Sequence, residues 1–370
     1  MPRDLTVGQR RVCSSRILTE DTKLDSGEIF CKPLRTSRRM ENMIEEWRKP
    51  EHRGRLGTKV LYATCDKHCY KLTIDNWDED NTMMSTQEEA NTRVLLHAAM
   101  NGYKAVVITA EDTDSLVISI AFFHTIHCQL YHRVGTQTRR TYIDIAKVAG
   151  SLGEEMCTAL IGLHAFTGCD SVSAFAGKGK VRGLKLTKSV AAYRECFTEL
   201  GQTWQVTDEL LHKLEVFTCN LYVSTGLTDV NQCRYQLFCA KRGNMISEQL
   251  PPCKDCLFHH AQRANYQAGI WRRSLECNPE VPRPSDCGWM VGDNGDLEIL
   301  WMTGPPAPSA VLELMNCNCI RSCDTAQCPC IINGLKCTKM CKNQSCDNQM
   351  EEETVDDTQT YSEDSDNYSD

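Results

Sequence analysis

The sequence of 370 residues has no long apolar run, and no stretch approaches the about 18 consecutive apolar residues of a membrane-spanning helix. It also lacks, near its start, the positively charged and then apolar pattern of a secretory leader. We therefore expect a soluble intracellular protein with no membrane partner. No P-loop, nucleophile elbow or dinucleotide-binding fingerprint is present, which argues against the enzyme classes that those motifs mark.

Basic residues are missing from the end of the chain. Residues 351–370 contain nine Asp or Glu and no Lys or Arg. Without this segment the net charge of −8 would become +1, so charge alone neither supports nor excludes a nucleic-acid partner. The composition predicts an acidic disordered tail at 350–370. By contrast, residues 1–58 are polar and basic, which predicts a partly flexible lead with one short helix near 40–47.

Cysteine is abundant and unevenly placed, since eight of the 23 cysteines lie between Cys317 and Cys346. The odd total and the dense cluster favour a metal site in a reducing compartment over the alternative, a secreted disulfide framework. Thiolates coordinate Zn²⁺ tetrahedrally, and short C-x-C steps allow one sulfur to serve neighbouring ions. The segment has too few apolar residues for a core, so metal must hold it together.

The cysteine spacing resembles that of the tesmin-type CXC (CRC) domain, a DNA-binding module with nine cysteines and three zinc ions. The C-N-C start, the central Gly334 and the closing Cys346 and Asn348 agree with this family. The resemblance implies a zinc-held module at 305–349, after a PPAP linker. It implies that the zinc ligands are Cys317, Cys319, Cys323, Cys328, Cys330, Cys337, Cys341 and Cys346.

This segment departs from the CXC pattern at three points. One residue is missing before Cys323, Asn343 occupies the place of the ninth cysteine, and Gln327 replaces an aromatic residue that enters the DNA minor groove. Cationic side chains remain that suit phosphate. They are Arg321, Lys336, Lys339 and Lys342. A structural zinc knot for protein contacts is the alternative interpretation.

The middle of the chain predicts an α/β layer at 59–190. Residues 59–73 indicate a strand or hairpin, 88–102 a helix, 128–145 two strands around a turn, and 145–168 a helix. Within KAVVITAEDTDSLVISIAFF (104–123), the apolar runs 106–108 and 116–118 are both typical of buried strands. Residues 191–304 predict a helical extension.

Acidic residues lie at three turns of this α/β layer. Asp112 and Asp114 follow the strand at 104–109, Glu88 and Glu89 open the helix before it, and Asp170 lies in the turn TGCD. Open α/β sheets bind ligands beyond the carboxyl ends of their strands. Carboxylates gathered there favour Mg²⁺ or Mn²⁺. The alternative is that these acids are only helix caps and turn residues.

The motifs at 88–90 (EEA), 109–114 (TAEDTD) and 167–170 (TGCD) resemble those of the flap-endonuclease branch of the PIN-like nucleases, over about 60–190. This resemblance implies a mostly parallel sheet with helices and two Mg²⁺ ions that activate water against a phosphodiester. The implied catalytic residues are Glu89, Asp112, Asp114 and Asp170. The following AFAGKGKVRGLK is similar to the family's segment that holds the DNA backbone, which implies contacts by Lys178, Lys180 and Arg182.

Two positions depart from the pattern of this nuclease family. Asn91 replaces a carboxylate of the family, and nothing in 1–58 resembles the first strand with its metal-binding Asp, so the expected domain is N-terminally incomplete. Two functions therefore stay open for a DNA or RNA partner: metal-dependent phosphodiester hydrolysis, or a catalytically inactive, zinc-dependent DNA- or protein-binding protein, of transposon-derived or genome-maintenance type. Both favour the nucleus, with the cytoplasm as the alternative.

Three weaker patterns remain. Cys253 and Cys256 precede His259 and His260 in a CxxC arrangement suited to zinc, with Cys277 or Cys287 as further candidates. Buried thiols on a helix are the alternative. Cys65, His68 and Cys69 are expected on a strand or turn, and His164 is expected to be a core histidine.

Overall fold

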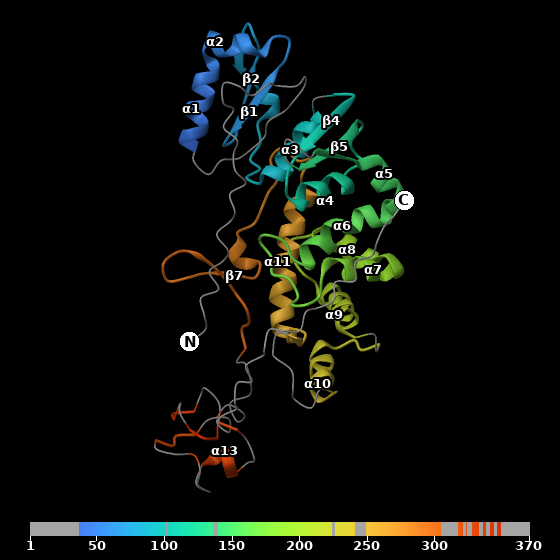
Figure 1. Cartoon of the computed structure of the whole chain (residues 1–370), viewed down its shortest axis with the longest axis vertical. Helices are drawn as coiled ribbons and strands as arrows, with labels where there is room; N and C mark the ends of the chain where they lie inside the picture. Colours follow the sequence, from blue (N-terminus) through green and yellow to red (C-terminus); the bar gives the residue numbers. More distant parts are fainter. Residues whose placement is uncertain are drawn as a thin grey trace. The chain divides into compact units, whose positions relative to one another are not determined.

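The computed structural model describes residues 37–100, 102–135, 140–223, 226–240 and 249–304, with parts of the cysteine segment (317–320, 323, 328–332, 336–337, 341–343 and 346–348). It is a mixed α/β structure that divides into two compact units, Met1–Met302 and Thr303–Asp370 (Figure 1). The lead at 1–36 and the acidic tail at 350–370 lie outside the described residues. No helix of the described part is long and apolar enough to cross a membrane.

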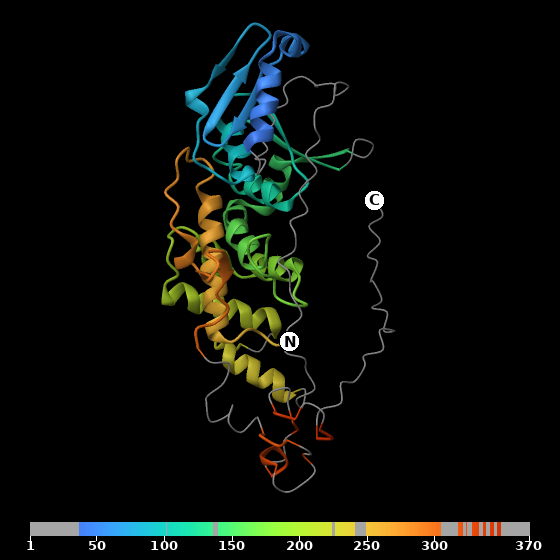
Figure 2. The ribbon, with the colours of Figure 1, turned by 90° about the vertical axis from the view of Figure 1, so that its left-hand side faces the viewer.

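The first elements form a small antiparallel sheet covered by a helix. They are α1 (Ser37–Arg48), α2 (Pro50–Arg53), η1 (Gly54–Leu56), β1 (Leu61–Cys65), β2 (His68–Leu72), β3 (Trp77–Glu79) and η2 (Asn81–Met83). Leu61 pairs with Leu72 across the β1–β2 hairpin. Ile44 of α1 belongs to the same buried apolar cluster as both leucines, and α1 lies along this sheet (Figure 2). The hairpin and the short helix expected near 40–47 are both present.

A second sheet follows, and Asp112 and Asp114 lie beyond the end of one of its strands. Its elements are α3 (Ala90–Met100), β4 (Ala105–Thr109), α4 (Thr113–Ala121), β5 (Gln129–Gly135) and β6 (Arg140–Asp144). The strand order is β4-β5-β6, with β4 parallel to β5 and β5 antiparallel to β6. The expected mostly parallel sheet is therefore not shown, because β4–β5 is the one parallel pair among the described strands.

The second apolar run of this region was wrongly predicted to be a strand. Residues 116–118 lie in α4, and the carboxylate of Asp112 accepts the backbone N–H of Ser115 at 3.1 Å to cap that helix. A short apolar run fits a buried helix as well as a buried strand, so periodicity cannot separate them. The Asp112 cap favours the helix, because it satisfies a backbone donor that a helix leaves unpaired at its N-terminus.

The remaining elements of the first unit are mainly helical, as expected for 191–304. They are α5 (Ile145–Leu152), α6 (Glu154–Phe166), α7 (Lys180–Ser189), α8 (Ala191–Glu199), α9 (Asp208–Tyr222), α10 (Val230–Ala240), α11 (Lys254–Arg272), η4 (Pro284–Asp286), β7 (Trp289–Val291) and β8 (Leu297–Ile299). β7 and β8 pair antiparallel.

The core of this unit is centred on α6 and extends across the expected boundary between residues 190 and 191. Phe166 of α6, Phe197 of α8 and Phe217 of α9 are fully buried, and the rings of Phe197 and Phe217 lie 4.7 Å apart. α6 and α8 approach closely because Gly162 has no side chain: a Cβ there would lie 2.2 Å from the carbonyl oxygen of Phe197. The expected domain boundaries stay predictions.

Candidate functional site

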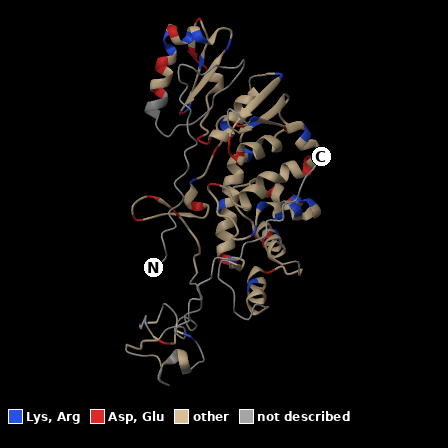
Figure 3. Ribbon diagram, viewed as in Figure 1, with Lys and Arg blue, Asp and Glu red and all other residues tan. Residues whose placement is uncertain are grey.

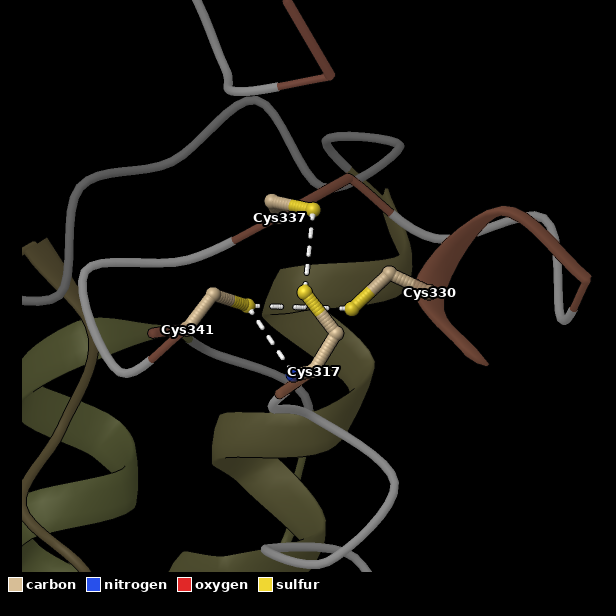
Figure 4. A group of neighbouring side chains, drawn as sticks. All are labelled: Cys317, Cys330, Cys337 and Cys341. Carbon is tan, nitrogen blue, oxygen red and sulfur yellow. Dashed lines mark hydrogen bonds between the residues drawn. The ribbon is translucent and has the colours of Figure 1, made fainter. Parts of the chain in front are cut away.

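The thiols of the C-terminal segment gather into two groups of four. One group is Cys317, Cys330, Cys337 and Cys341, and the other is Cys317, Cys323, Cys328 and Cys337. Within each group all the sulfur atoms lie within 4.8 Å of one another, and all these residues are buried. Figure 4 shows the first group, whose members come from separate stretches of the segment and point toward one another. Buried groups of four thiols are consistent with Zn²⁺.

The spacing between neighbouring sulfur atoms is regular. The Sγ of Cys317 lies 3.6 Å from that of Cys323 and 3.9 Å from that of Cys337, and the Sγ atoms of Cys330 and Cys341 are 3.7 Å apart. Cys319 is half-buried and Cys346 is buried, but neither belongs to a group of four among the described residues. The helix α13 (Pro329–Ile332) is the one helix described in this segment.

Nitrogen donors surround the sulfur atoms. The backbone N–H of Cys317 points at the Sγ of Cys341 at 3.4 Å, and the side-chain amide of Asn348 donates to the Sγ of Cys337 at 3.3 Å. The pKa of Cys328 is lowered to about 6, chiefly because the backbone N–H of Ile331 donates to its sulfur. Such donors stabilise thiolates and orient them toward a metal. Asn348, noted in the sequence only as part of the motif, is therefore in direct contact with a thiol.

Three of the four predicted acidic residues, Glu89, Asp112 and Asp114, lie close enough to interact electrostatically. Asp112 and Asp114 lie beyond the carboxyl end of β4, as expected, and Glu89 directly precedes α3. The pKa of Glu89 is raised to about 7, chiefly by burial and also by the nearby carboxylates of Asp114 and Asp112, while two hydrogen bonds act in the opposite direction. Those bonds come from α11: the indole N–H of Trp271 donates at 2.6 Å and the amide of Gln267 at 2.9 Å.

Asp114 is held by a chain of polar groups. Its carboxylate lies 2.7 Å from Nε2 of His164, and the ammonium of Lys180 lies 3.0 Å from Nδ1 of the same ring. Lysine has only donors, so Nδ1 accepts and the neutral ring donates from Nε2 to Asp114. Lys180 also donates to the carbonyls of His164 and Gly168. Thus His164, expected to be a core histidine, is buried and also positions a candidate catalytic residue.

The four predicted carboxylates do not form a compact metal group in the described structure. Asp170 is exposed in its turn, and among the described residues no group of three ligand atoms within 4.8 Å includes any of the four acids. Asp112 caps α4, as the alternative interpretation of these acids as helix caps and turn residues expects. A site for Mg²⁺ or Mn²⁺ stays a prediction, and its best-supported members are the three acids that share one electrostatic environment, Glu89, Asp112 and Asp114.

The predicted nucleic-acid-binding residues have different surroundings. The ammonium of Lys178 lies 4.9 Å from the ring centre of Tyr222, that of Lys180 is directed inward, and Arg182 is exposed. Arg182 is part of α7, a helix with no acidic residue (Figure 3). Its further cations Lys185 and Lys188 are exposed and were not singled out from the sequence. In the C-terminal segment Lys336 and Lys342 are exposed, while Arg321 and Lys339 lie outside the described residues.

The weaker cysteine patterns do not assemble in the described structure. Cys253 caps α11, His260 donates from Nε2 to the carbonyl of Phe166 at 2.8 Å, and neither belongs to a metal-sized group. Cys65 and Cys69 lie on β1 and β2, as expected. Cys65 does form a group with Glu41 and Asp66, which sequence spacing could not indicate because Glu41 comes from α1.

Comparisons with known proteins give no relative: no family model, no curated protein and no solved structure matches the chain.

Proposed function

We propose that this chain is a nucleic-acid-associated protein whose C-terminal segment is a CXC-type module that folds around Zn²⁺ and binds phosphate. The observation that carries the proposal is the pair of buried four-cysteine groups, which a metal-free segment could not hold without an apolar core. Zinc fixes the backbone, and exposed Lys336 and Lys342 then present fixed positive charge. Phosphate contacts of this kind give affinity without base specificity.

The test is a binding titration of the full chain with single-stranded DNA, duplex DNA and RNA at several salt concentrations. We expect binding by the zinc-loaded protein and its loss after chelation. Replacing Lys336 and Lys342 by Gln should weaken binding and lower the salt slope by about 1 per lysine. Lys67→Gln, which changes an exposed lysine of the other unit, is the matched control. Binding that is indifferent to zinc and to both lysines would refute this proposal.

A second candidate is phosphodiester hydrolysis by a PIN-like domain, and the convergence of Glu89, Asp112 and Asp114 favours it. Two segments bring carboxylates to the carboxyl end of a strand, where a divalent cation would offset their repulsion. When bound, such a cation supplies activated water and stabilises the charge of the leaving oxygen. Asp112 and Asp114 would hold it, and His164 and Lys180 would hold Asp114. Without hydrolysis, the chain would be an inactive binding protein.

An assay with Mg²⁺ or Mn²⁺ on flap, single-stranded DNA and RNA substrates separates these two functions. Asp112→Asn keeps the helix cap, because Asn caps as well as Asp, but removes the carboxylate charge. Asp144→Asn changes the cap of α5 in the same way, away from the acidic turns, and is the matched control. We expect cutting that is lost in Asp112→Asn alone. No cutting by the wild-type protein, or equal cutting by both variants, would leave the binding function.

A nucleic-acid-associated function places the protein in the nucleus, with the cytoplasm as the alternative. Imaging of a fluorescent fusion tests this proposal. A purely cytoplasmic signal would contradict a nuclear location and would favour an RNA partner over a DNA partner.

A further inference from the structure

The two four-cysteine groups of the C-terminal segment overlap. Cys317 and Cys337 belong to both, Cys330 and Cys341 only to one, and Cys323 with Cys328 only to the other. Two independent tetrahedral sites would use each thiol once. The overlap is therefore a specific property of this chain's fold.

The sulfur distances match a shared arrangement of tetrahedra. In a zinc site with Zn–S bonds of about 2.3 Å, tetrahedral geometry separates neighbouring sulfur atoms by about 3.8 Å. The Sγ of Cys317 lies 3.9 Å from Cys337, the edge common to both groups. It lies 3.6 Å from Cys323, an edge of one group, and Cys330 lies 3.7 Å from Cys341, an edge of the other.

Charge also favours sharing. Two separate ZnS₄ sites would collect eight thiolates, whereas two ions that share two thiolates need six and leave less uncompensated negative charge. The remaining charge meets hydrogen-bond donors: the amide of Asn348 reaches the shared Cys337 at 3.3 Å, and the backbone N–H of the shared Cys317 reaches Cys341 at 3.4 Å. Such hydrogen bonds orient metal-bound thiolates and stabilise their negative charge.

We infer that this segment binds two zinc ions as one cluster in which the thiolates of Cys317 and Cys337 are ligands to both. Cys330 and Cys341 complete one site, and Cys323 and Cys328 complete the other. Cys319 and Cys346 are not ligands, so the cluster differs from the three-ion module that the sequence resemblance implies. The inference rests on the proposed zinc module and specifies its stoichiometry and connectivity.

The first experiment counts zinc by native mass spectrometry of the full reduced chain and its variants. We expect two ions in the wild type. Cys323→Ser and Cys330→Ser should each lose one ion, Cys317→Ser and Cys337→Ser should lose both, and Cys319→Ser should retain both. Three ions in the wild type, loss of an ion in Cys319→Ser, or loss of a single ion in Cys317→Ser and Cys337→Ser would overturn the inference.

A second measurement does not depend on the folding of any variant. In wild-type protein loaded with ¹¹³Cd, two cadmium resonances should be split by coupling through the shared sulfur atoms. Two unsplit resonances would overturn the sharing. Nucleic-acid binding is measured separately. A coupled two-ion cluster that does not bind nucleic acid would refute the proposed function but not this inference. Nucleic-acid binding by a three-ion module would refute this inference but not the proposed function.

Discussion

The indole N–H of Trp271 donates to the carboxylate of Glu89 at 2.6 Å, although 182 residues separate them in the sequence. The same indole lies beside the ring of His164, whose centre is 5.5 Å away. His164 in turn contacts Asp114. Trp271 of α11 therefore contacts Glu89 directly and is linked to Asp114 through His164. The helical extension is thus part of the surroundings of the candidate site.

Glu89 should make stability depend on pH. Its pKa is raised from 4.5 to about 7 in the folded state, so the folded protein binds more protons between these values than the unfolded chain. Stability should therefore be highest below pH 4.5 for this group and fall by on the order of 3 kcal/mol as pH rises to 7. Urea unfolding of Glu89→Gln and wild type across this range measures it. Exposed Glu88→Gln is the control, and equal pH slopes in wild type and Glu89→Gln would contradict the assignment.

Trp271→Phe should shift the pKa of Glu89 further upward, because it removes a donor that stabilises the carboxylate while keeping an aromatic ring in the core. Loss of one such hydrogen bond costs about 1–3 kcal/mol at a pH where Glu89 is ionised. The pKa can be followed by ¹³C NMR of the Glu89 carboxyl carbon. An unchanged titration would show that the indole does not act on this carboxylate.

Lys180 should donate a hydrogen bond to Nδ1 of His164. Its ammonium lies 3.0 Å from Nδ1, so the ring proton belongs on Nε2, toward Asp114. In Lys180→Met, Nδ1 loses its donor while Asp114 still accepts from Nε2, so the ¹⁵N resonance of Nδ1 should shift and the Nε2–H tautomer should persist. Long-range ¹H–¹⁵N NMR of the imidazole measures this shift. Lys178→Met removes a lysine that faces Tyr222 instead and should leave the spectrum unchanged; a change of the same size in both variants would contradict the positioning role.

Gly162→Ala should destabilise the first unit. The new methyl group would lie 2.2 Å from the carbonyl oxygen of Phe197, a backbone atom that moves only if α6 and α8 separate. Overpacking of this kind costs about 1–3 kcal/mol. Gly150→Ala, in α5, meets no atom within 4 Å and should be neutral or stabilising by up to about 1 kcal/mol. Thermal unfolding followed by circular dichroism compares the two, and equal midpoints would contradict the close approach.

Removing zinc should unfold one unit and spare the other. The cluster that packs the C-terminal segment consists of cysteines with Ile331, so its described residues hold almost no apolar core without metal. The first unit instead packs around aromatic and aliphatic side chains such as Phe166 and Leu214. After chelation, hydrogen exchange and proteolysis should increase within 317–348 while the helical signal of the first unit persists. A protease-resistant segment after chelation would contradict a metal-dependent fold.

The sequence predicted well those features that depend on nearby residues. The β1–β2 hairpin, the β5–β6 pair and the gathering of thiols all follow from local spacing. The strand expected at 116–118 was wrong because a cap at Asp112, rather than periodicity, selects a helix. The donors to Glu89 could not be foreseen: Trp271 and Gln267 carry no local pattern, and only the tertiary packing of α11 brings them to α3.

The placement of α11 has a consequence for any attempt to divide the protein experimentally. Arg263 donates to the carbonyls of Gly288 and Leu300, so the helix also holds the β7–β8 hairpin. A fragment that stops at residue 190 would leave Glu89 without its two donors and would expose Phe166 to water. A fragment designed to keep these contacts should therefore include α11 and the β7–β8 hairpin up to Leu300. An inactive shorter piece would say nothing about the chemistry of the whole chain.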